Sequence, residues 1–380
     1  MPCRPHAATV VLVGALTLIL GVTIAPSAGM AGSPPAPGSQ GESPGHATTR
    51  LLDTPFPDPG FYVEGRRRYI YATGYDARRG WRAYRAAQWD PERRRYTKPR
   101  PSMLTRPRWV GPRGPGVDAG QVHMWAPTVW KRKVKGPRDY VMYFSASRRG
   151  GRDCLGMAVA TSPLGPFVPK PRPLRCGTGG STLIDPVHFR NRAGQHFVVY
   201  KRRAFGPPSI GIWALRVRHD GTARPHARPV RLVDGGRAGL EAPSVVSRRG
   251  RTYLFASRHR YDTCQYETVV YVSGRGHRPF RSLGRLDLRR PGGGRFCGPG
   301  GAEVRNVGGI FRMVFHAFDS NPRVVRNARR LAWGVPLRWT RQGRPYAAPR
   351  RPDSRFVPSA TVSRRTKSGS SSFSPYRSRS

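Results

Sequence analysis

Three acidic residues stand at corresponding points of a repeated motif and could act together on one substrate. Asp58 and Asp185 each precede a proline, and Glu241 precedes Ala242-Pro243. A lone Asp before Pro is a common turn former, but turn formation does not explain recurrence at the same point of a repeat. Two carboxyl groups can hydrolyse a glycosidic bond, because one protonates the leaving oxygen while the other activates a water. A third carboxylate nearby raises the pKa of the acid by like-charge repulsion.

The acids belong to a repeat of about 60 residues, in which an acid or Trp, a small residue and Pro precede a turn and an aromatic-rich strand. The five copies open at Asp58, Trp125, Asp185, Glu241 and, more weakly, Gly298. A period of this size with short strands predicts a propeller of four-stranded blades. The 45 Gly and 39 Pro residues favour many turns over long helices. We therefore predict an all-β, five-bladed β-propeller whose blade-opening residues meet at the axis.

The N-terminal residues predict an export signal. Arg4 precedes an apolar run over residues 7–25, and Gly29-Met30-Ala31 fits a cleavage site. An uncleaved membrane anchor is the alternative, because the run is near the ~18 residues that a spanning helix needs. We favour a secreted, extracellular protein without stable membrane insertion. The predicted parts are a signal peptide at 1–31, a disordered leader at 32–50, the propeller at 51–358 and a disordered basic tail at 359–380.

Four cysteines remain after removal of the signal, and disulfides persist in exported proteins. We pair Cys154 with Cys176 and Cys264 with Cys297, because a hairpin-sized interval separates each pair. Two other connectivities stay open. The sequence has no Cys-x-x-Cys and no Cys/His spacing typical of zinc, so it gives little support for a metal site.

The chain is strongly basic, with 68 Lys and Arg against 20 Asp and Glu and a formal net charge of +48. This charge could hold the protein on acidic polymers such as pectic acids, or on nucleic acid. The other interpretation is an Arg-rich composition displayed on a solvated surface. We favour it, because Arg residues are scattered through every predicted blade. We expect a monomer without a specific nucleic-acid partner.

The ordered set of motifs resembles glycoside hydrolase family 43, secreted five-bladed propellers that act on arabinose- and xylose-containing plant polysaccharides. The resemblance covers roughly residues 53–350 and includes Trp125-Ala126-Pro127 and the stretch 161–167. It implies that Asp58, in Phe56-Pro57-Asp58-Pro59, is the general base. It also implies that Glu241 is the general acid and that Asp185, in Ile184-Asp185-Pro186, is the pKa modulator.

One motif departs from the family, whose fifth blade often carries a Gly-Pro-Gly-His that contacts a central ion. Here the sequence is Gly298-Pro299-Gly300-Gly301, which weakens the expectation of a central calcium, and we expect no required cofactor. His316 lies in the same blade and could face the axis, although a lone His is more often structural. Trp125 is the best candidate for stacking on a sugar. Phe56 and Phe318 are weaker candidates, for which packing between blades is the favoured role.

The resulting prediction is a secreted inverting glycosidase with a polysaccharide or oligosaccharide substrate containing α-L-arabinofuranosides or β-D-xylosides. A non-catalytic propeller that binds carbohydrates or polyanions is the alternative. The three acids argue against it, because a binding module has no need of a carboxylate trio.

Overall fold

A computed structural model describes residues 47–74, 84–112, 122–133, 136–149, 151–204, 210–274, 279–325 and 327–349. The predicted signal peptide, most of the predicted leader and the predicted basic tail lie outside the described residues. Every regular element in the described part of the chain is a β-strand, so it contains no helix that could cross a membrane.

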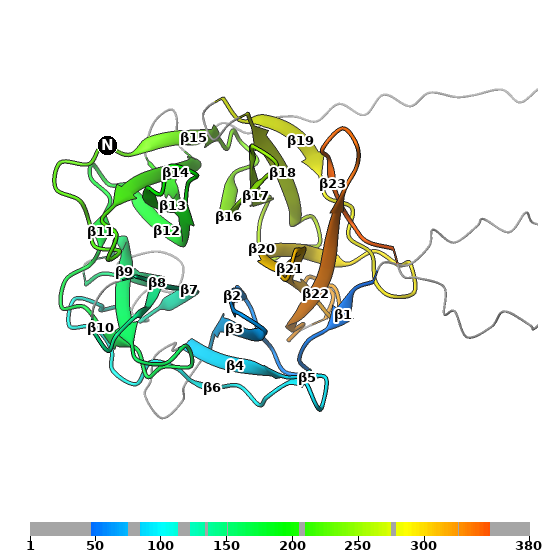
Figure 1. Ribbon diagram of the computed structural model, residues 1–380, viewed down its shortest axis with the longest axis horizontal. Coiled ribbons are helices and arrows are strands. Elements are labelled where there is room, and N and C mark those ends of the chain that lie inside the picture. Colours follow the sequence, from blue (N-terminus) through cyan, green and yellow to red (C-terminus); the bar gives the residue numbers. More distant parts are fainter. Residues whose placement is uncertain are drawn as a thin grey trace, which may run out of the picture. The chain divides into compact units, whose positions relative to one another are not determined.

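The strands form five antiparallel sheets around a common centre, which confirms the predicted five-bladed β-propeller (Figure 1). Blade one contains β2 (Gly60–Glu64), β3 (Arg67–Thr73), β4 (Tyr84–Asp90), β5 (Arg95–Tyr96) and β6 (Arg100–Pro101). Blade two contains β7 (Met124–Lys131), β8 (Tyr140–Ser147), β9 (Asp153–Ala160), β10 (Val168–Pro169) and β11 (Arg175–Cys176).

The remaining three blades follow in chain order. Blade three contains β12 (Thr182–Arg190), β13 (His196–Arg203), β14 (Ile210–Val217) and β15 (Val230–Asp234). Blade four contains β16 (Leu240–Arg248), β17 (Arg251–Arg258), β18 (Glu267–Ser273) and β19 (Arg281–Arg285). Blade five contains β20 (Cys297–Val307), β21 (Ile310–Phe318), β22 (Arg330–Trp339), β23 (Pro345–Ala347) and β1 (Thr49–Arg50).

Strand β1 joins the first described residues to the last blade. Thr49 pairs with Gly334 and Arg50 with Trp333 on β22, so blue β1 lies beside orange β22 in Figure 1. The predicted leader, which ran to residue 50, therefore extended too far. Its Gly- and Pro-rich composition gave no sign of strand pairing, because a two-residue strand depends on backbone hydrogen bonds to a partner far along the chain.

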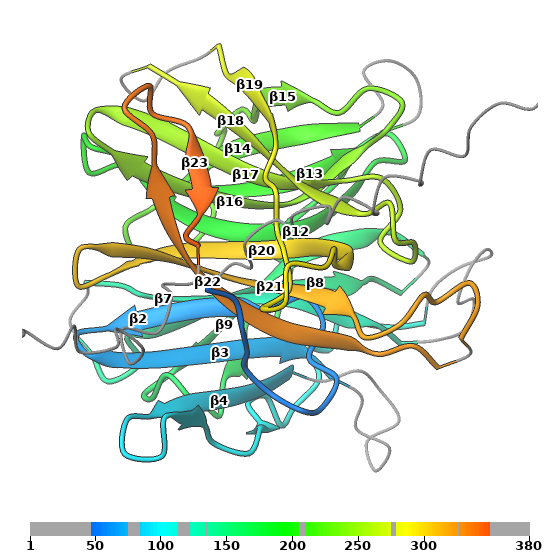
Figure 2. The ribbon, with the colours of Figure 1, turned by 90° about the vertical axis from the view of Figure 1, so that its right-hand side faces the viewer.

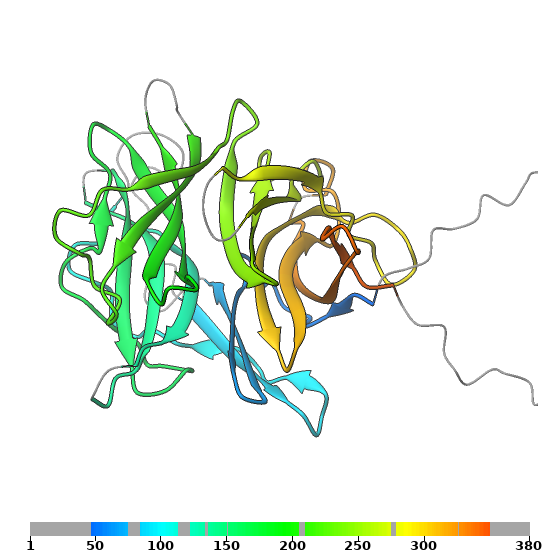
Figure 3. The ribbon, with the colours of Figure 1, turned by 45° about the horizontal axis from the view of Figure 1, so that its top comes forward.

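The hydrophobic core is a ring of five clusters, each between two neighbouring blades. The innermost strands close the same ring, because β2 contacts β7, β7 contacts β12, β12 contacts β16, β16 contacts β20, and β20 contacts β2. Figure 2 shows β20 between the blue strands of blade one and the green strands of blade four, and Figure 3 shows the blue strands between blades two and five. Both faces of each blade are thus covered, which explains apolar runs such as Tyr140–Phe144.

One disulfide lies within blade two, and the other joins blade four to blade five. Cys154 is bonded to Cys176 and Cys264 to Cys297, which confirms the predicted pairing. The second bond joins the loop before β18 to the start of β20, and it therefore fixes a segment that lies close to the axis.

Candidate active site

Near the start of each innermost strand one residue has the left-handed backbone conformation. The φ angles are 52° at Asp58, 50° at Ala126, 55° at Asp185, 47° at Ala242 and 59° at Gly301. Pairing is shifted at this point in β7, β12, β16 and β20, which is the pattern of a β-bulge. Non-glycine residues seldom adopt positive φ, and such strain gathers at functional sites. These five positions are called the bulge residues below.

A ring of hydrogen bonds links the bulge residues to the preceding blade. The backbone N–H of Asp58 donates to His316 Nδ1 at 3.1 Å, and that of Ala126 donates to Thr73 Oγ1 at 3.0 Å. The Asp185 N–H donates to Ser145 Oγ at 2.7 Å, and the Gly301 N–H donates to Ser257 Oγ at 2.8 Å. We call Thr73, Ser145, Ser257 and His316 the ring acceptors. They lie on the second strand of their blades and hold the bulge residues in place.

The bulge residues surround a central pocket of about 630 Å³. Its lining includes Asp58, Asp185 and Glu241, so the structure brings the three predicted acids together from blades one, three and four. Trp125 from blade two also lines it. A second hollow of about 500 Å³ lies between blades three and four, but no acidic residue of the described chain lines it. The carboxyl groups that acid–base catalysis needs therefore lie in the central pocket and not in the second hollow.

Asp58 is held as a carboxylate. Its Oδ1 accepts from Arg330 at 2.9 Å and its Oδ2 accepts from the Thr73 hydroxyl at 2.8 Å. Burial acts to raise the pKa of Asp58, but the Arg330 charge and these hydrogen bonds outweigh it, and the pKa is lowered. Burial, followed by the Arg330 charge, lowers the pKa of His316 to about 3, so this ring is neutral at ordinary pH. Its Nδ1 can then accept from the Asp58 N–H, which leaves the ring proton on Nε2.

Asp185 and Glu241 form a pair with opposite surroundings. Asp185 Oδ2 accepts from the Ala242 N–H at 3.0 Å, whereas Glu241 accepts from Lys201 Nζ at 2.7 Å and from the Tyr266 hydroxyl at 2.8 Å. Burial and then the nearby Glu241 charge raise the pKa of Asp185 to about 7. The pair therefore retains a proton to near-neutral pH, while Asp58 across the pocket is ionised.

Several pocket residues were missing from the sequence-based prediction. Lys201, Arg330 and Tyr261 line the pocket, and Tyr266 holds Glu241. Half of the Tyr261 side chain is exposed, and the Arg330 guanidinium lies 5.4 Å from its ring centroid. None of these residues belongs to the repeated motif. Glu303 also lines the pocket. Its carboxylate accepts from the Phe61 N–H, from the Thr128 hydroxyl and from Arg305, and it thereby connects blades one, two and five near the axis.

The predicted aromatic residues separate into two groups. Trp125 lines the pocket, whereas Phe56 and Phe318 are buried and are absent from its lining. Phe56 packs in the cluster between blades one and five, which agrees with the packing role favoured from the sequence. Trp125 and Tyr261 are therefore candidates for sugar stacking, and Tyr266 lines the pocket with them.

The His316 ring occupies the place at the axis where a side chain at position 301 would lie. A Cβ at Gly301 would lie 2.6 Å from His316 Cε1. His316 Nδ1 is engaged by Asp58, and calcium prefers oxygen ligands. Among the residues that the structure describes, no group of three or more His, Cys, Asp or Glu is placed to hold a metal.

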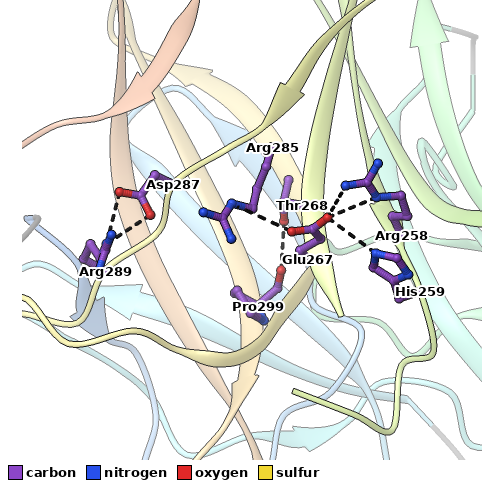
Figure 4. A network of polar contacts seen from close by, with 8 residues as sticks. All are labelled: Arg258, His259, Glu267, Thr268, Arg285, Asp287, Arg289 and Pro299. Atoms are coloured by element: carbon purple, nitrogen blue, oxygen red, sulfur yellow. Dashed lines mark hydrogen bonds and ion pairs between the residues drawn. The ribbon is translucent and has the colours of Figure 1, made fainter. Parts of the chain in front are cut away.

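Glu267, the first residue of β18, contacts Arg258 and His259 at the other end of the loop that carries Tyr261 and Tyr266 (Figure 4). Arg258 Nε donates to Glu267 Oε1 at 3.0 Å, and His259 Nε2 lies 3.6 Å from the same oxygen. Arg285 approaches the other carboxylate oxygen at 3.8 Å. With the Cys264–Cys297 bond, these contacts fix the loop that presents both tyrosines to the pocket.

A five-bladed propeller with three carboxyl groups in its axial pocket has the form of a propeller glycoside hydrolase. The model of the glycosyl hydrolases family 43 matches residues 51–345, and the chain belongs to this family.

The relatives of known structure have the same fold. A thermostable family-43 glycoside hydrolase superposes with a TM-score of 0.62 at 19% identity, over 80% of this chain and 98% of that chain. An α-L-arabinanase of Cellvibrio cellulosa, complexed with arabinohexaose, gives 0.59 at 20% identity, over 78% and 96%. The xylosidase/arabinosidase 43A of Humicola insolens is 34% identical over 77 residues, 20% of this chain. The chain matches only 21% of the length of that relative.

Proposed function

We propose that the protein is a secreted, monomeric, inverting glycosidase that acts on arabinose- or xylose-containing polysaccharides. One observation carries this proposal: three carboxyl groups from three blades line one pocket, and their surroundings favour different charge states. A bond-cleaving pair needs such a difference, because one carboxyl must be ionised while another holds a proton.

Asp58 is the general base of this mechanism. Its lowered pKa keeps it ionised, and Arg330 and Thr73 fix both of its oxygens. It takes a proton from a water whose oxygen attacks the anomeric carbon on the face opposite the leaving group. A single displacement of this kind inverts the anomeric configuration.

Glu241 is the general acid, and Asp185 modulates it. As the glycosidic C–O bond breaks, Glu241 transfers its proton to the leaving oxygen, and solvent later restores the proton. Burial and then the Glu241 charge raise the pKa of Asp185, so the two carboxyl groups together keep one proton to near-neutral pH.

The substrate class rests on the relatives and on the aromatic residues that line the pocket. The named relatives are an α-L-arabinanase and a xylosidase/arabinosidase, which favours α-L-arabinofuranosides or β-D-xylosides. Trp125 and Tyr261 offer ring faces for sugar stacking. The two disulfides support export, and the net charge of +48 favours retention on acidic pectic or glucuronate-bearing polymers.

Hydrolysis of aryl α-L-arabinofuranosides and aryl β-D-xylosides by three variants tests the assignment. Glu241→Gln should lose about 10²–10⁴-fold in kcat on poor leaving groups and much less on good ones, because these need no acid. Asp58→Asn should lose activity on both kinds alike. Glu64→Gln changes a carboxylate paired with Lys131 outside the pocket and serves as the matched control. A folded wild-type protein that hydrolyses neither glycoside, yet binds the polymers, would support the binding propeller instead.

A further inference from the structure

Lys201 occupies the one ring position, among the described blades, whose side chain cannot accept a hydrogen bond. The pairing register makes this position equivalent to the ring acceptors: Lys201 pairs with Ile184 as Ser145 pairs with Trp125 and Ser257 with Glu241. A lysine ammonium has three donors and no acceptor. The hydrogen-bond ring must therefore close differently between blades three and four.

The structure shows how this closure is made. The N–H of the bulge residue Ala242 donates to Asp185 Oδ2 instead of to a residue of β13. The Lys201 ammonium turns to Glu241 Oε2, and both side chains of this ion pair are only 16% exposed. Tyr266 donates to the other Glu241 oxygen. Position 201 thus carries a hydrogen-bond donor where the other blades carry an acceptor. As a result, Asp185 accepts from a backbone N–H, whereas Glu241 accepts from Lys201 and Tyr266.

We propose that Lys201 is a positioning residue that engages Glu241 in an ion pair before substrate binds and so leaves the proton of the carboxyl pair on Asp185. Substrate hydroxyls must then draw the ammonium away before Glu241 can receive that proton and donate it. This inference rests on the proposed function, in which Glu241 is the general acid. It makes acid formation depend on an occupied pocket.

The electrostatics around the pair agree with this arrangement. Burial lowers the pKa of Lys201, but the charges of Glu241 and Asp185 outweigh it, and the pKa is raised, so the ammonium persists. Burial raises the pKa of Tyr266 well above its usual value, so its hydroxyl remains a donor. Besides each other, Asp185 and Glu241 interact with Lys201, with Tyr266 and with Asp58 across the pocket, and Arg203 on β13 acts in turn on Lys201.

The pH dependence of kcat/KM in Lys201→Met tests the proposal. Activity falls at high pH when the carboxyl pair loses its shared proton. Removing a cation in contact with the pair should move this basic limb upward by about one to three pH units. Lys201→Arg should keep the limb near its wild-type position, because it restores the charge. Lys131→Met removes a lysine from another lysine–glutamate ion pair, at 2.8 Å and outside the pocket, and it should leave the limb unmoved. An unmoved limb in an active Lys201→Met enzyme would overturn the proposal.

A second readout does not require activity. With ¹³C-labelled aspartate side-chain carboxyls, the signal that disappears in Asp185→Asn identifies Asp185. The Lys201 charge lowers the pKa of Asp185, so the midpoint of this signal's titration should move upward in Lys201→Met. Identical titration curves in the two proteins would refute the role of Lys201. A shifted titration in a protein that hydrolyses no glycoside would instead refute the proposed function and leave the charge coupling intact.

Discussion

Arg330 offers a sharp test of how the structure sets the charge of Asp58. The two groups form an ion pair, with Arg330 Nη1 2.9 Å from Asp58 Oδ1 and side chains 19% and 23% exposed. Arg330 is the largest influence that lowers the pKa of Asp58 against the effect of burial. Replacement of Arg330 by Met should therefore raise that pKa.

The magnitude follows from the contact. An adjacent opposite charge lowers a carboxyl pKa by about one to three units, and each unit corresponds to about 1.4 kcal/mol. Because solvent reaches both Arg330 and Asp58, we expect the lower part of this range. At acidic pH, protonation of Asp58 lowers kcat/KM. In Arg330→Met this acidic decline should lie about one to two pH units higher than in the wild type.

The same pair predicts a change in stability. The pKa of Asp58 is lower in the folded state, so its contribution to stability is present above the unfolded pKa and is lost as pH falls through the folded pKa. Arg330→Met should therefore lower the melting temperature at about pH 7 more than at about pH 3.

The assay compares pH–rate profiles and thermal unfolding of wild type, Arg330→Met and Arg330→Lys. Arg329→Met is the matched control, because Arg329 pairs with Asp319 at 2.8 Å and does not line the pocket. Arg330→Lys should restore part of the limb position. An acid limb that stays in place in Arg330→Met, with measurable activity, would refute the claim that Arg330 sets the ionisation of Asp58.

Three further outcomes are expected. Gly301→Ala should lower the melting temperature and kcat, because its Cβ would lie 2.6 Å from the His316 ring that holds Asp58; unchanged kinetics would remove His316 from the account. In the double variant Cys264→Ser/Cys297→Ser the free energy of unfolding should be about 3–4 kcal/mol lower than in the wild type. Equal stability of the wild type with and without dithiothreitol would contradict this. Retention on polygalacturonate should weaken steeply between about 50 and 200 mM salt, and salt-independent retention would exclude an electrostatic origin.

The repeat and its acids were accessible from the sequence for a physical reason. Each blade must bury both faces and must open with a tight bulge, so apolar strands and proline-containing motifs recur along the chain. The structure refines one equivalence. Ala242, with its positive φ, corresponds to Asp185, so Glu241 stands one position earlier in the repeat, where blade two has Trp125.

The rest of the site depends on pairing between strands, which spacing alone does not reveal. Lys201 and His316 lie on second strands, and only the register brings them against Glu241 and Asp58. Arg330 lies on the last blade and contacts Asp58 in the first, although the two residues are 272 positions apart in the sequence. An apolar ring such as Phe56 near a motif could not be told from a pocket residue, because burial depends on the neighbouring blade.

The measurement that tests the central claim most directly is ¹H NMR of wild-type protein mixed with an aryl α-L-arabinofuranoside or an aryl β-D-xyloside. The first sugar released should have the anomeric configuration opposite to that of the substrate, because Asp58 activates water for a single displacement. A first product of retained configuration would contradict the assignment of Asp58 as a base. The absence of any released sugar, from folded protein on both substrates, would contradict the proposed activity.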